Sequence, residues 1–550
     1  MSGLGQRRLD ETGDTRRAAT VQVELIILGQ AGLGGLNASI ERGPLFCYSW
    51  ASAQLQQRPL MDRTSGQSKA YRVVSRLYQP AWHWSLAFLL AFFYVATSLY
   101  IASRRLLWFD EIFTAFASRM PNVRTIWESL SVSLQQIPLP YFLITRIFDQ
   151  VFRHADIGLR VPSVLGLGAG LLVTFDIARR LTDGLYGLIA MSFLTTSFVI
   201  YYGHEARPYA LYFMLAAMAL WLWVVTKEES KTAAVAFGAV FFIGVGVHYY
   251  FVLCLAPFVI MALATRRIFH PKVIAAATGV ICLLAVLYPQ IASTLSAARA
   301  GKIGAWGLAS TTLLQWVYGD LFPTATIPLV LIAIGVAIFG SRSGERLVAS
   351  MSSGERVSWL FLAVPLASYI LAHLTSGFMH SRYIIGAVPG IAVAVTCLFW
   401  RHCRESRYLS LALLVVVGGF GLSQQLRTIR HVDHIQATGA GDHQEQTRQM
   451  LALEDTLRRE GKQHFAVASE LLFLEVWYYS KHPEQYGLIA PAWEYKKYIT
   501  LNFLSVEEIV ANARQTALIN PDPGLLNALS RAGLHLKVRF AEPHYIVYLE

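Results

Sequence analysis

The stretch HEARPYALYFMLAAMALWLWVV, residues 204–225, places Glu205 and Arg207 directly before an apolar run that approaches the length of a bilayer crossing. A similar pattern occurs earlier, where the apolar run Trp84–Ile101 is soon followed by Trp108-Phe109-Asp110-Glu111. Charged side chains at a membrane boundary are costly and mostly serve a function. We therefore expect a polytopic helical membrane protein with its functional site at the ends of its helices.

The composition supports this expectation. The chain has 550 residues, of which 54% are hydrophobic, and a mean hydropathy of +0.42, which is too apolar for an ordinary soluble protein. Its net charge of +12 comes from basic residues spread through short loops. They are topology signals, and we expect no nucleic acid partner. The five cysteines are scattered without metal-ligand spacing and imply no disulfide framework.

Apolar periodicity predicts about eleven membrane spans, some of them slightly short. An odd number places the two termini on opposite sides of the membrane. The predicted spans are Trp84–Ile101, Leu159–Ala178, Leu185–Tyr202, Tyr209–Val225, Ala233–Val247, Tyr250–Ala264, Val273–Tyr288, Ile327–Phe339, Trp359–Leu374, Ile384–Trp400 and Tyr408–Leu422.

The basic residues favour a cytoplasmic N-terminus, because Lys and Arg gather in cytoplasmic loops. With this orientation the inside loops contain Arg179, Arg180, Lys227, Lys231, Arg266, Arg267, Lys272, Arg342, Arg346, Arg356, Arg401, Arg404 and Arg407. The outer loops are poorer in such residues. The same orientation places Asp110, Glu205, His380 and Arg382 together on the outer side.

One apolar segment, Leu139–Phe152, is not counted as a span because it is short and carries Arg146 and Asp149. Counting it would put the two carboxylate clusters on opposite sides of the membrane. We expect it to be an interfacial helix along the outer leaflet, with Glu111–Met120 as a second one.

The chain divides into three predicted regions. Residues 1–80 are expected to be a disordered cytoplasmic tail, or sequence upstream of a later start such as Met61. Residues 81–426 form the membrane domain, and residues 427–550 a small α/β domain on the outer face. We expect that domain to contain helices at His443–Glu460, Val506–Ala513 and Leu525–Ala532, and strands at His464–Ala468, Tyr486–Ala490, Tyr498–Phe503, Thr516–Asn520, Leu534–Phe540 and Tyr545–Leu549. No glycine-rich phosphate loop opens its helices, so we assign it no nucleotide.

Asp110 is the first candidate catalytic residue. A carboxylate beside the aromatic residues Trp108 and Phe109 can act as a general base when burial and nearby cations adjust its pKa. Glu111 would then cap or orient the interfacial helix that begins there. The alternative is that the Asp-Glu pair is only an N-terminal helix cap.

Glu205 and Arg207 form the second candidate cluster, and Pro208 opens the next span where proline is well tolerated. The alternative is an ordinary solvated loop pair. The neighbouring His204 is a titratable group, although a single loop histidine is more often incidental.

The third cluster, His380-Ser381-Arg382-Tyr383, precedes the span at Ile384. An arginine fork and a helix N-terminus both favour phosphate, so we expect phosphate binding here. The alternative is that Arg382 extends to lipid headgroups. Lys302 is a weaker candidate of the same kind.

These residues carry a family resemblance. The order Asp110-Glu111, Ile137-Pro138-Leu139-Pro140-Tyr141, Leu159-Arg160-Val161-Pro162-Ser163 and Glu205-Ala206-Arg207-Pro208-Tyr209 resembles the GT-C class of membrane glycosyltransferases. Within this class, the chain resembles the bacterial family 39-like group, which includes the RgtA/B/C/D-like enzymes. This group is related to protein O-mannosyltransferases and to the lipid A aminoarabinose transferase. The resemblance is strong from Trp84 to Val225 and weaker onward to Trp400.

The resemblance implies an inverting glycosyltransferase of the bacterial cytoplasmic membrane. Its donor would be a sugar linked to polyprenyl phosphate, and its acceptor a cell-envelope glycan, lipid or protein. The family's acidic base falls on Asp110, and a further acidic or polar site on Glu205. No cofactor is certain, and a divalent cation near Glu205 is left open. The family often has Pro-Pro-Leu-Tyr-Tyr where this chain has Pro138-Leu139-Pro140-Tyr141-Phe142, so no catalytic role is assigned there.

The remaining candidates would bind substrate. Arg207 and Arg382, with Lys302 or His380, would stabilise the developing charge of the leaving phosphate. The full set of expected substrate-binding residues is Glu111, Arg207, Tyr209, Lys302, His380, Arg382 and Tyr383.

Two other functions fit an apolar, many-helix chain. A secondary transporter or lipid flippase would place charges near the bilayer midplane and often shows repeated halves. The chain has no convincing internal repeat, and its candidate charges gather on one face. A structural membrane scaffold would leave these charged clusters unexplained.

Overall fold

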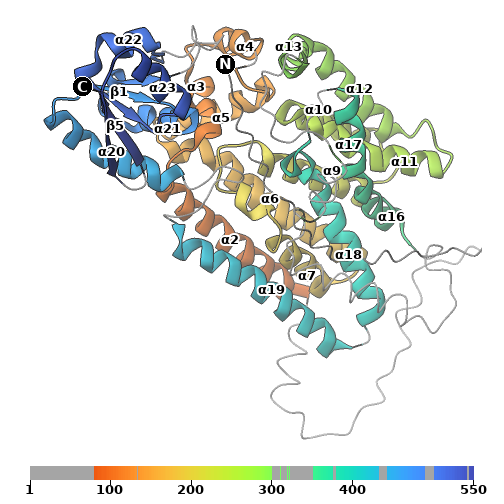
Figure 1. The fold of residues 1–550 in the computed structure, drawn as a ribbon. Helices are drawn as coiled ribbons and strands as arrows, with labels where there is room; N and C mark the ends of the chain where they lie inside the picture. The colour runs from red at the N-terminus through yellow and green to blue at the C-terminus, as the bar shows by residue number, and fades with distance from the viewer. Residues whose placement is uncertain are drawn as a thin grey trace, which may run out of the picture. The chain divides into compact units, whose positions relative to one another are not determined.

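The protein is mainly helical and carries a small β-sheet formed by residues near its C-terminus (Figure 1). The computed structural model describes residues 80–132, 134–299, 310, 319, 321, 351–375, 379–404, 406–432, 443–489, 501–541 and 544–549. The predicted N-terminal tail, apart from Pro80, the predicted span Ile327–Phe339 and Lys302 lie outside these residues.

Most predicted spans have a helix at their place in the described residues. Five helical stretches are long and apolar enough to cross a membrane: α2 (Pro80–Arg104), α6 (Asp156–Leu181), α16 to α17 (Ser353–Leu374), η4 with α18 (Ser381–Cys403) and α19 (Arg407–Arg430). A sixth crossing would combine α12 (Pro271–Val286) and α13 (Tyr288–Arg299), which are bent by 71°.

Four further apolar helical stretches are shorter. They are α7 (Gly184–Thr195), α9 (Tyr209–Val225), α10 (Lys231–Val247) and the continuous stretch of η1 (Tyr249–Leu255) and α11 (Ala256–Ala264). A helix of 17 residues such as α9 is about 26 Å long, slightly less than the hydrocarbon thickness of about 30 Å. The chain is therefore a membrane protein with several candidate spans.

The predicted span Leu185–Tyr202 is not one helix, which corrects the sequence interpretation. Helix α7 ends at Thr195, and a separate turn, α8 (Val199–Tyr202), follows. Three consecutive hydroxyls, those of Thr195, Thr196 and Ser197, each donate to the carbonyl three residues earlier at 2.7 Å. Such side-chain bonds compete with the helical backbone pattern and explain the break.

Helices α6 and α9 pack closely and place the loop between α8 and α9. A Cβ added to Gly166 of α6 would lie 3.0 Å from the Ala210 backbone of α9, so the contact requires glycine. Nearby on α6, the Ser163 hydroxyl donates to the Arg207 carbonyl at 2.8 Å. The second charged cluster is thus attached to this helix pair.

Both segments that were predicted to be interfacial are helical and lie within the first large loop. They are α3 (Phe109–Arg119) and α5 (Leu139–Val151), with the short α4 (Val123–Leu130) between them. Arg146 and Asp149, which argued against a span, contact α3 and the residues that follow it. The Arg146 guanidinium donates to the Met120 carbonyl, and Asp149 pairs with Arg119 at 3.0 Å.

The sheet has the strand order β2-β1-β3-β5-β4. Strand β1 (His464–Val467) pairs in parallel with β2 (Tyr486–Leu488) and β3 (Thr516–Ile519), and β5 (His544–Leu549) is antiparallel to β3 and to β4 (Leu536–Ala541). The surrounding helices are α20 (His443–Arg459), α21 (Glu470–Tyr479), α22 (Val506–Ala511) and α23 (Pro523–Arg531).

Two details of this region differ from the sequence interpretation. The described part of the predicted strand Tyr498–Phe503 contributes only an isolated bridge between Phe503 and Leu488. Helix α21 was not predicted, because its run ELLFLEVWYY is apolar on all sides and shows no amphipathic pattern.

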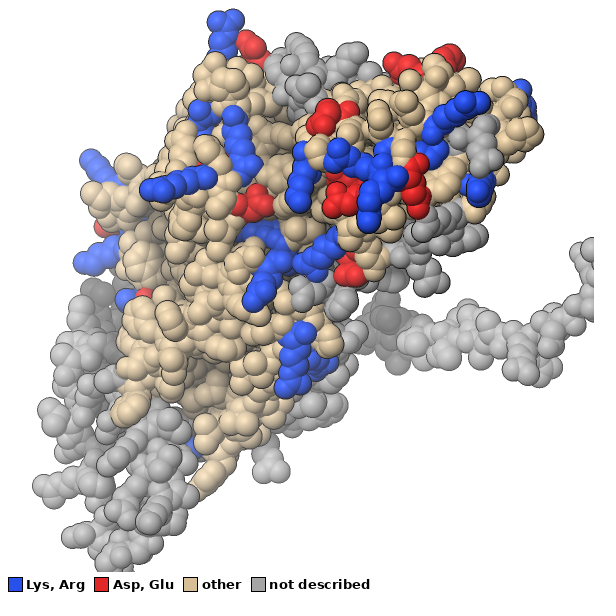
Figure 2. Space-filling model, turned by 90° about the vertical axis from the view of Figure 1, so that its left-hand side faces the viewer, with Lys and Arg blue, Asp and Glu red and all other residues tan. Residues whose placement is uncertain are grey.

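The surface separates a charged part from an uncharged one. Figure 2 shows Lys, Arg, Asp and Glu gathered over the upper part of one face, above a broad surface with few charges. On α2 and α19 large apolar side chains such as Leu89, Phe92 and Val415 are exposed. Such exposed apolar helix faces are suited to contact with lipid.

Candidate functional site

Asp110 lies between two arginines that come from distant parts of the chain. It is the second residue of α3, and its Oδ2 atom is 3.3 Å from Arg207 Nη2 and 3.3 Å from Arg382 Nη1. Arg207 belongs to the loop between α8 and α9, and Arg382 to η4 (Ser381–Ala387). The three candidate clusters of the sequence therefore each contribute a residue to one site.

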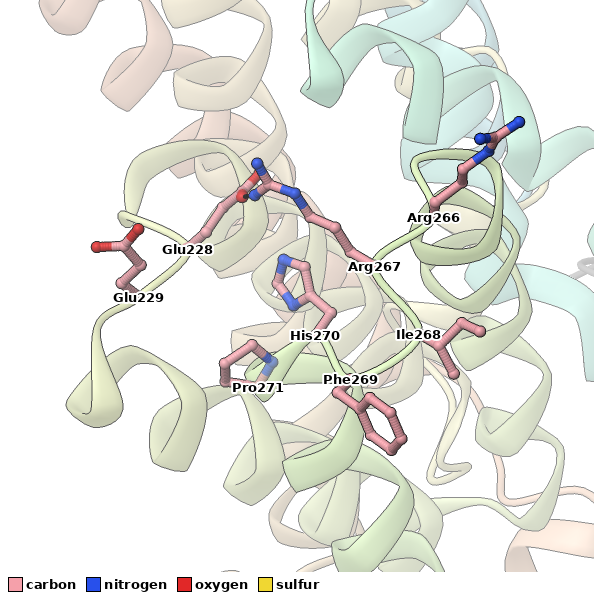
Figure 3. A pocket seen from close by; sticks show the side chains of 8 residues that line it. All are labelled: Glu228, Glu229, Arg266, Arg267, Ile268, Phe269, His270 and Pro271. Atoms are coloured by element: carbon pink, nitrogen blue, oxygen red, sulfur yellow. Dashed lines mark ion pairs between the residues drawn. The ribbon is translucent and has the colours of Figure 1, made fainter.

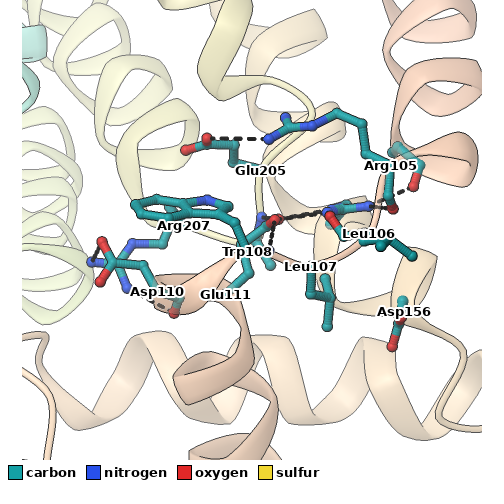
Figure 4. Close-up of polar contacts among 12 residues, drawn as sticks. Arg105, Leu106, Leu107, Trp108, Asp110, Glu111, Asp156, Glu205 and Arg207 are labelled. Atoms are coloured by element: carbon teal, nitrogen blue, oxygen red, sulfur yellow. Dashed lines mark hydrogen bonds and ion pairs between the residues drawn. The ribbon is translucent and has the colours of Figure 1, made fainter. Parts of the chain in front are cut away.

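Arg207 is held firmly in this site. Its Nη1 atom donates to the Asp110 carbonyl at 3.1 Å and to Gln135 Oε1 at 3.2 Å. The guanidinium groups of Arg207 and Arg382 lie 5.9 and 5.8 Å from the centre of the Tyr209 ring. Cation–π contact with one buried ring keeps two like charges side by side near a single carboxylate. Figure 4 shows Arg207 next to Asp110.

His380 and Tyr383 flank Arg382. His380 Nδ1 accepts a hydrogen bond from the Arg382 amide at 3.4 Å and so caps the start of η4. Burial, reinforced by the Arg382 charge, lowers the pKa of His380 to about 4, so its imidazole is neutral near pH 7. The Tyr383 ring lies 5.7 Å from the Arg382 guanidinium.

His248 was missed by the sequence analysis and lies against this cluster. Its ring stacks on Tyr212 at 5.4 Å and lies 5.5 Å from the rings of both Tyr209 and Tyr383. Burial and the charges of Arg207 and Arg382 lower its pKa to about 3. The available signal was a histidine placed directly between two predicted spans, which is a costly position for a polar side chain.

Glu111 is completely buried and fully bonded. Its carboxylate accepts hydrogen bonds from Nε and Nη2 of Arg160, both at 2.7 Å. It also accepts the Trp108 amide at 3.2 Å and the Ala206 amide at 2.6 Å. Burial raises the pKa of Glu111, but the charges of Arg160 and Arg105 and the hydrogen bonds from Arg160 and Ala206 together outweigh burial, and the net shift is downward. Glu111 also accepts the amide of Trp108, the residue before α3, which is the expected helix-capping contact.

Arg160 uses all of its hydrogen-bond donors. Besides the two bonds to Glu111, it donates to the carbonyls of Ala102, Arg105 and Leu106 at 2.6–2.8 Å. An arginine has five N–H donors, and each one has an acceptor here. Arg160 thereby joins the end of α2, the start of α3 and α6.

Glu205 belongs to a neighbouring buried cluster, in which Arg105 is its ion-pair partner. Its Oε1 atom is 3.8 Å from Arg105 Nη2, and both side chains are fully buried. Burial raises the pKa of Glu205 to about 7. The Ala206 amide, bonded to Glu111, links this cluster to the start of α3.

Both the sequence and the fold are similar to those of known proteins. The family model described as dolichyl-phosphate-mannose-protein mannosyltransferase matches residues 136–292. The structure resembles ArnT from Cupriavidus metallidurans bound to undecaprenyl phosphate, with a TM-score of 0.55 and 13% identity over 85% of this chain and 98% of that one. The chain therefore has a fold similar to that of ArnT.

Two further solved structures match the chain less well. ArnT from Cupriavidus metallidurans in the apo state gives a TM-score of 0.53 at 13% identity over 86% of this chain and 98% of that one. The Archaeoglobus fulgidus oligosaccharyltransferase complex with Zn and sulfate gives 0.43 at 9% identity, covering 71% of this chain and 61% of that one. No curated protein sequence matches the chain.

Within the described part of the chain, no three His, Cys, Asp or Glu side chains come together as a group that could hold a metal ion. A hollow of about 290 Å³ lies between the α9–α10 and α11–α12 loops and contains none of the candidate residues (Figure 3). Its lining residues are Glu228, Glu229, Arg266, Arg267, Ile268, Phe269, His270 and Pro271.

Proposed function

We propose that this protein transfers a sugar from a polyprenyl-phosphate donor to a hydroxyl group of a cell-envelope acceptor, with inversion at the anomeric carbon. The observation that carries the proposal is Asp110, a carboxylate held between Arg207 and Arg382 at converging helix ends. A base and two phosphate-binding groups are the parts that such a reaction needs.

Asp110 is the general base in this proposal. It removes the proton of the acceptor hydroxyl while that oxygen forms a bond to the anomeric carbon. The bond between this carbon and the phosphate oxygen breaks, and its electron pair leaves with the polyprenyl phosphate. Arg207 and Arg382 stabilise the negative charge that develops there.

The same two arginines explain how the Asp110 carboxylate is first held in ion pairs and then made available to the acceptor. Each guanidinium group lies 3.3 Å from the Asp110 carboxylate and offsets its charge. A bound phosphate competes for both guanidinium forks, and the carboxylate becomes available to the acceptor. Tyr209, in cation–π contact with both arginines, limits how far they can move.

The donor class follows from the fold and from the chemistry of the cluster. The similar ArnT structure is described as bound to undecaprenyl phosphate. An isoprenoid tail needs access from the lipid, while its phosphate needs cations at the membrane surface. We propose that Glu205, His380, Tyr383 and Lys302 orient the sugar or the acceptor around this phosphate site.

The topology is part of the same proposal. We place the N-terminus in the cytoplasm, the site on the outer face of the bacterial cytoplasmic membrane and about eleven spans in between. The sheet and helices of residues 443–549 then form a small outer α/β domain next to the site.

The test is transfer in proteoliposomes supplied with radiolabelled polyprenyl-phosphate sugars and envelope acceptors. We expect Asp110→Asn to lower turnover by at least about 100-fold, the contribution of a general base. Glu128→Gln, which removes an exposed carboxylate paired with Arg124, is the matched control and is expected to leave turnover unchanged. Full activity of Asp110→Asn would remove it as the base. Substrate-dependent ion flux without release of polyprenyl phosphate would favour a transporter.

A further inference from the structure

The linker formed by residues 105–109 runs from the end of α2 to Phe109, the first residue of α3, and leads directly into Asp110. Its backbone leaves the helical pattern after Arg105, so its buried amides need partners from elsewhere. The Trp108 amide donates to Glu111 within α3. The amides of Leu107 and Phe109 find their acceptors far along the chain.

Both acceptors belong to α21, in the region of the sheet. The Leu107 amide donates to the Tyr479 hydroxyl at 2.6 Å, and the Phe109 amide donates to the Glu475 carboxylate. Glu475 is 1% exposed, and the Thr447 hydroxyl of α20 also donates to it, at 2.7 Å. Two of the three amides before Asp110 are thus held by α21.

Helix α21 is itself fixed against the membrane helices. Tyr478 and Tyr479 donate to the two oxygens of Asp156, the first residue of α6, at 3.0 and 2.7 Å. The Trp477 ring packs against Phe116 of α3 at 5.6 Å. The Tyr479 hydroxyl therefore connects a rigid point on α6 to the linker backbone.

We propose that Tyr479 and Glu475 are positioning residues for the candidate base, and that α21 completes the site by holding the 105–109 linker. This inference rests on the proposed function for its effect on turnover. Asp110 directly follows the linker whose amides are bonded to α21. A shift of the linker would therefore move the Asp110 carboxylate away from Arg207 and Arg382. Displacements of this size are costly to a reaction that depends on orientation.

Two adjacent tyrosines provide a matched pair of variants. Tyr479→Phe removes the hydroxyl that accepts a hydrogen bond from the Leu107 amide and donates one to Asp156. Tyr478→Phe removes a hydroxyl that contacts Asp156 and Arg119 but no linker amide. Both substitutions keep the aromatic ring and its packing, and both remove one bond to the same carboxylate.

The first measurement is steady-state transfer with a polyprenyl-phosphate sugar. We expect Tyr479→Phe to lower kcat about tenfold with the donor KM changed less than twofold, and Tyr478→Phe to change kcat less than twofold. Glu475→Gln, which keeps an oxygen for the Phe109 amide, is expected to retain most of the activity that Glu475→Ala loses. Equal losses in both tyrosine variants would indicate a general structural role and overturn the proposal.

The second measurement is hydrogen–deuterium exchange of the full-length protein in detergent, which does not depend on turnover. Amides of residues 107–109 are expected to exchange about 5- to 10-fold faster in Tyr479→Phe, the factor for one ordinary hydrogen bond, and unchanged in Tyr478→Phe. Unchanged exchange in Tyr479→Phe refutes the positioning role. Faster exchange without any transfer by the parent protein would reject the proposed function but keep the positioning of the linker.

Discussion

Replacing Arg160 with alanine is expected to destabilise the protein by about 3–5 kcal/mol, because it leaves the completely buried Glu111 without its partner. The same change also leaves the carbonyls of Ala102, Arg105 and Leu106 without their donor. This loss is a large fraction of the free energy of unfolding of an ordinary domain, which is about 5–15 kcal/mol. Arg160→Lys is expected to lose less, since it keeps the charge but cannot make the five bonds of the guanidinium.

The assay is unfolding of the purified protein in detergent, followed by intrinsic fluorescence. The matched control is Arg124→Ala, which breaks the exposed pair with Glu128 at 2.8 Å, where the arginine side chain is 87% exposed. Such a surface pair contributes only about 0.3–0.5 kcal/mol. If Arg160→Ala unfolded like the control, the buried pair would not hold α2, α3 and α6 together, and our account of the site's framework would be wrong.

Three further predictions concern other parts of the molecule. Arg382→Ala is expected to weaken the binding of polyprenyl phosphate about 10- to 100-fold, which is the contribution of one charge-assisted hydrogen bond. The control is Arg404→Ala, since Arg404 lies just beyond the far end of α18 and stacks on Trp400, and it is expected to leave binding unchanged. Isothermal titration calorimetry measures both affinities. Burial raises the pKa of Glu475 from 4.5 to about 7, so its ionisation costs stability progressively as the pH rises from 4.5 to 7. Glu475→Gln should therefore gain on the order of 3 kcal/mol relative to the parent above pH 7 and nothing below pH 4.5, and an equal difference at both pH values would contradict this. Gly166→Ala is expected to lower the apparent Tm because its Cβ would lie 3.0 Å from backbone atoms of α9, while Gly419→Ala in α19, with no atom within 4 Å, should raise it slightly.

The sequence predicted the helices well where hydropathy decides their position. The span predicted at Tyr209–Val225 has the bounds of α9, and the helices expected at α3 and α5 are present. The interfacial position of α3 and α5 stays a prediction. The break after Thr195 was not predicted. Hydropathy does not register hydrogen bonds between hydroxyls and the backbone, although the run Thr195-Thr196-Ser197 contained the signal.

The candidate site was predictable in part. Charges at helix ends pointed to Asp110, Arg207 and Arg382, and the structure brings them within 3.3 Å contacts. The sequence did not separate Glu205 from this cluster, because position along the chain does not show that Arg105 is its partner. The supporting bonds from α21 were also beyond reach, since local patterns do not reveal which distant hydroxyl meets a given amide.

The bond between Leu107 and Tyr479 joins positions 372 residues apart, which has a consequence for biosynthesis. The ribosome makes the 105–109 linker early and α21 only near the end of translation. The membrane helices can be inserted while this linker still lacks two of its acceptors. A nascent chain, or one shortened before residue 479, would therefore carry an unfinished candidate site, and this site would become complete only when synthesis is nearly finished.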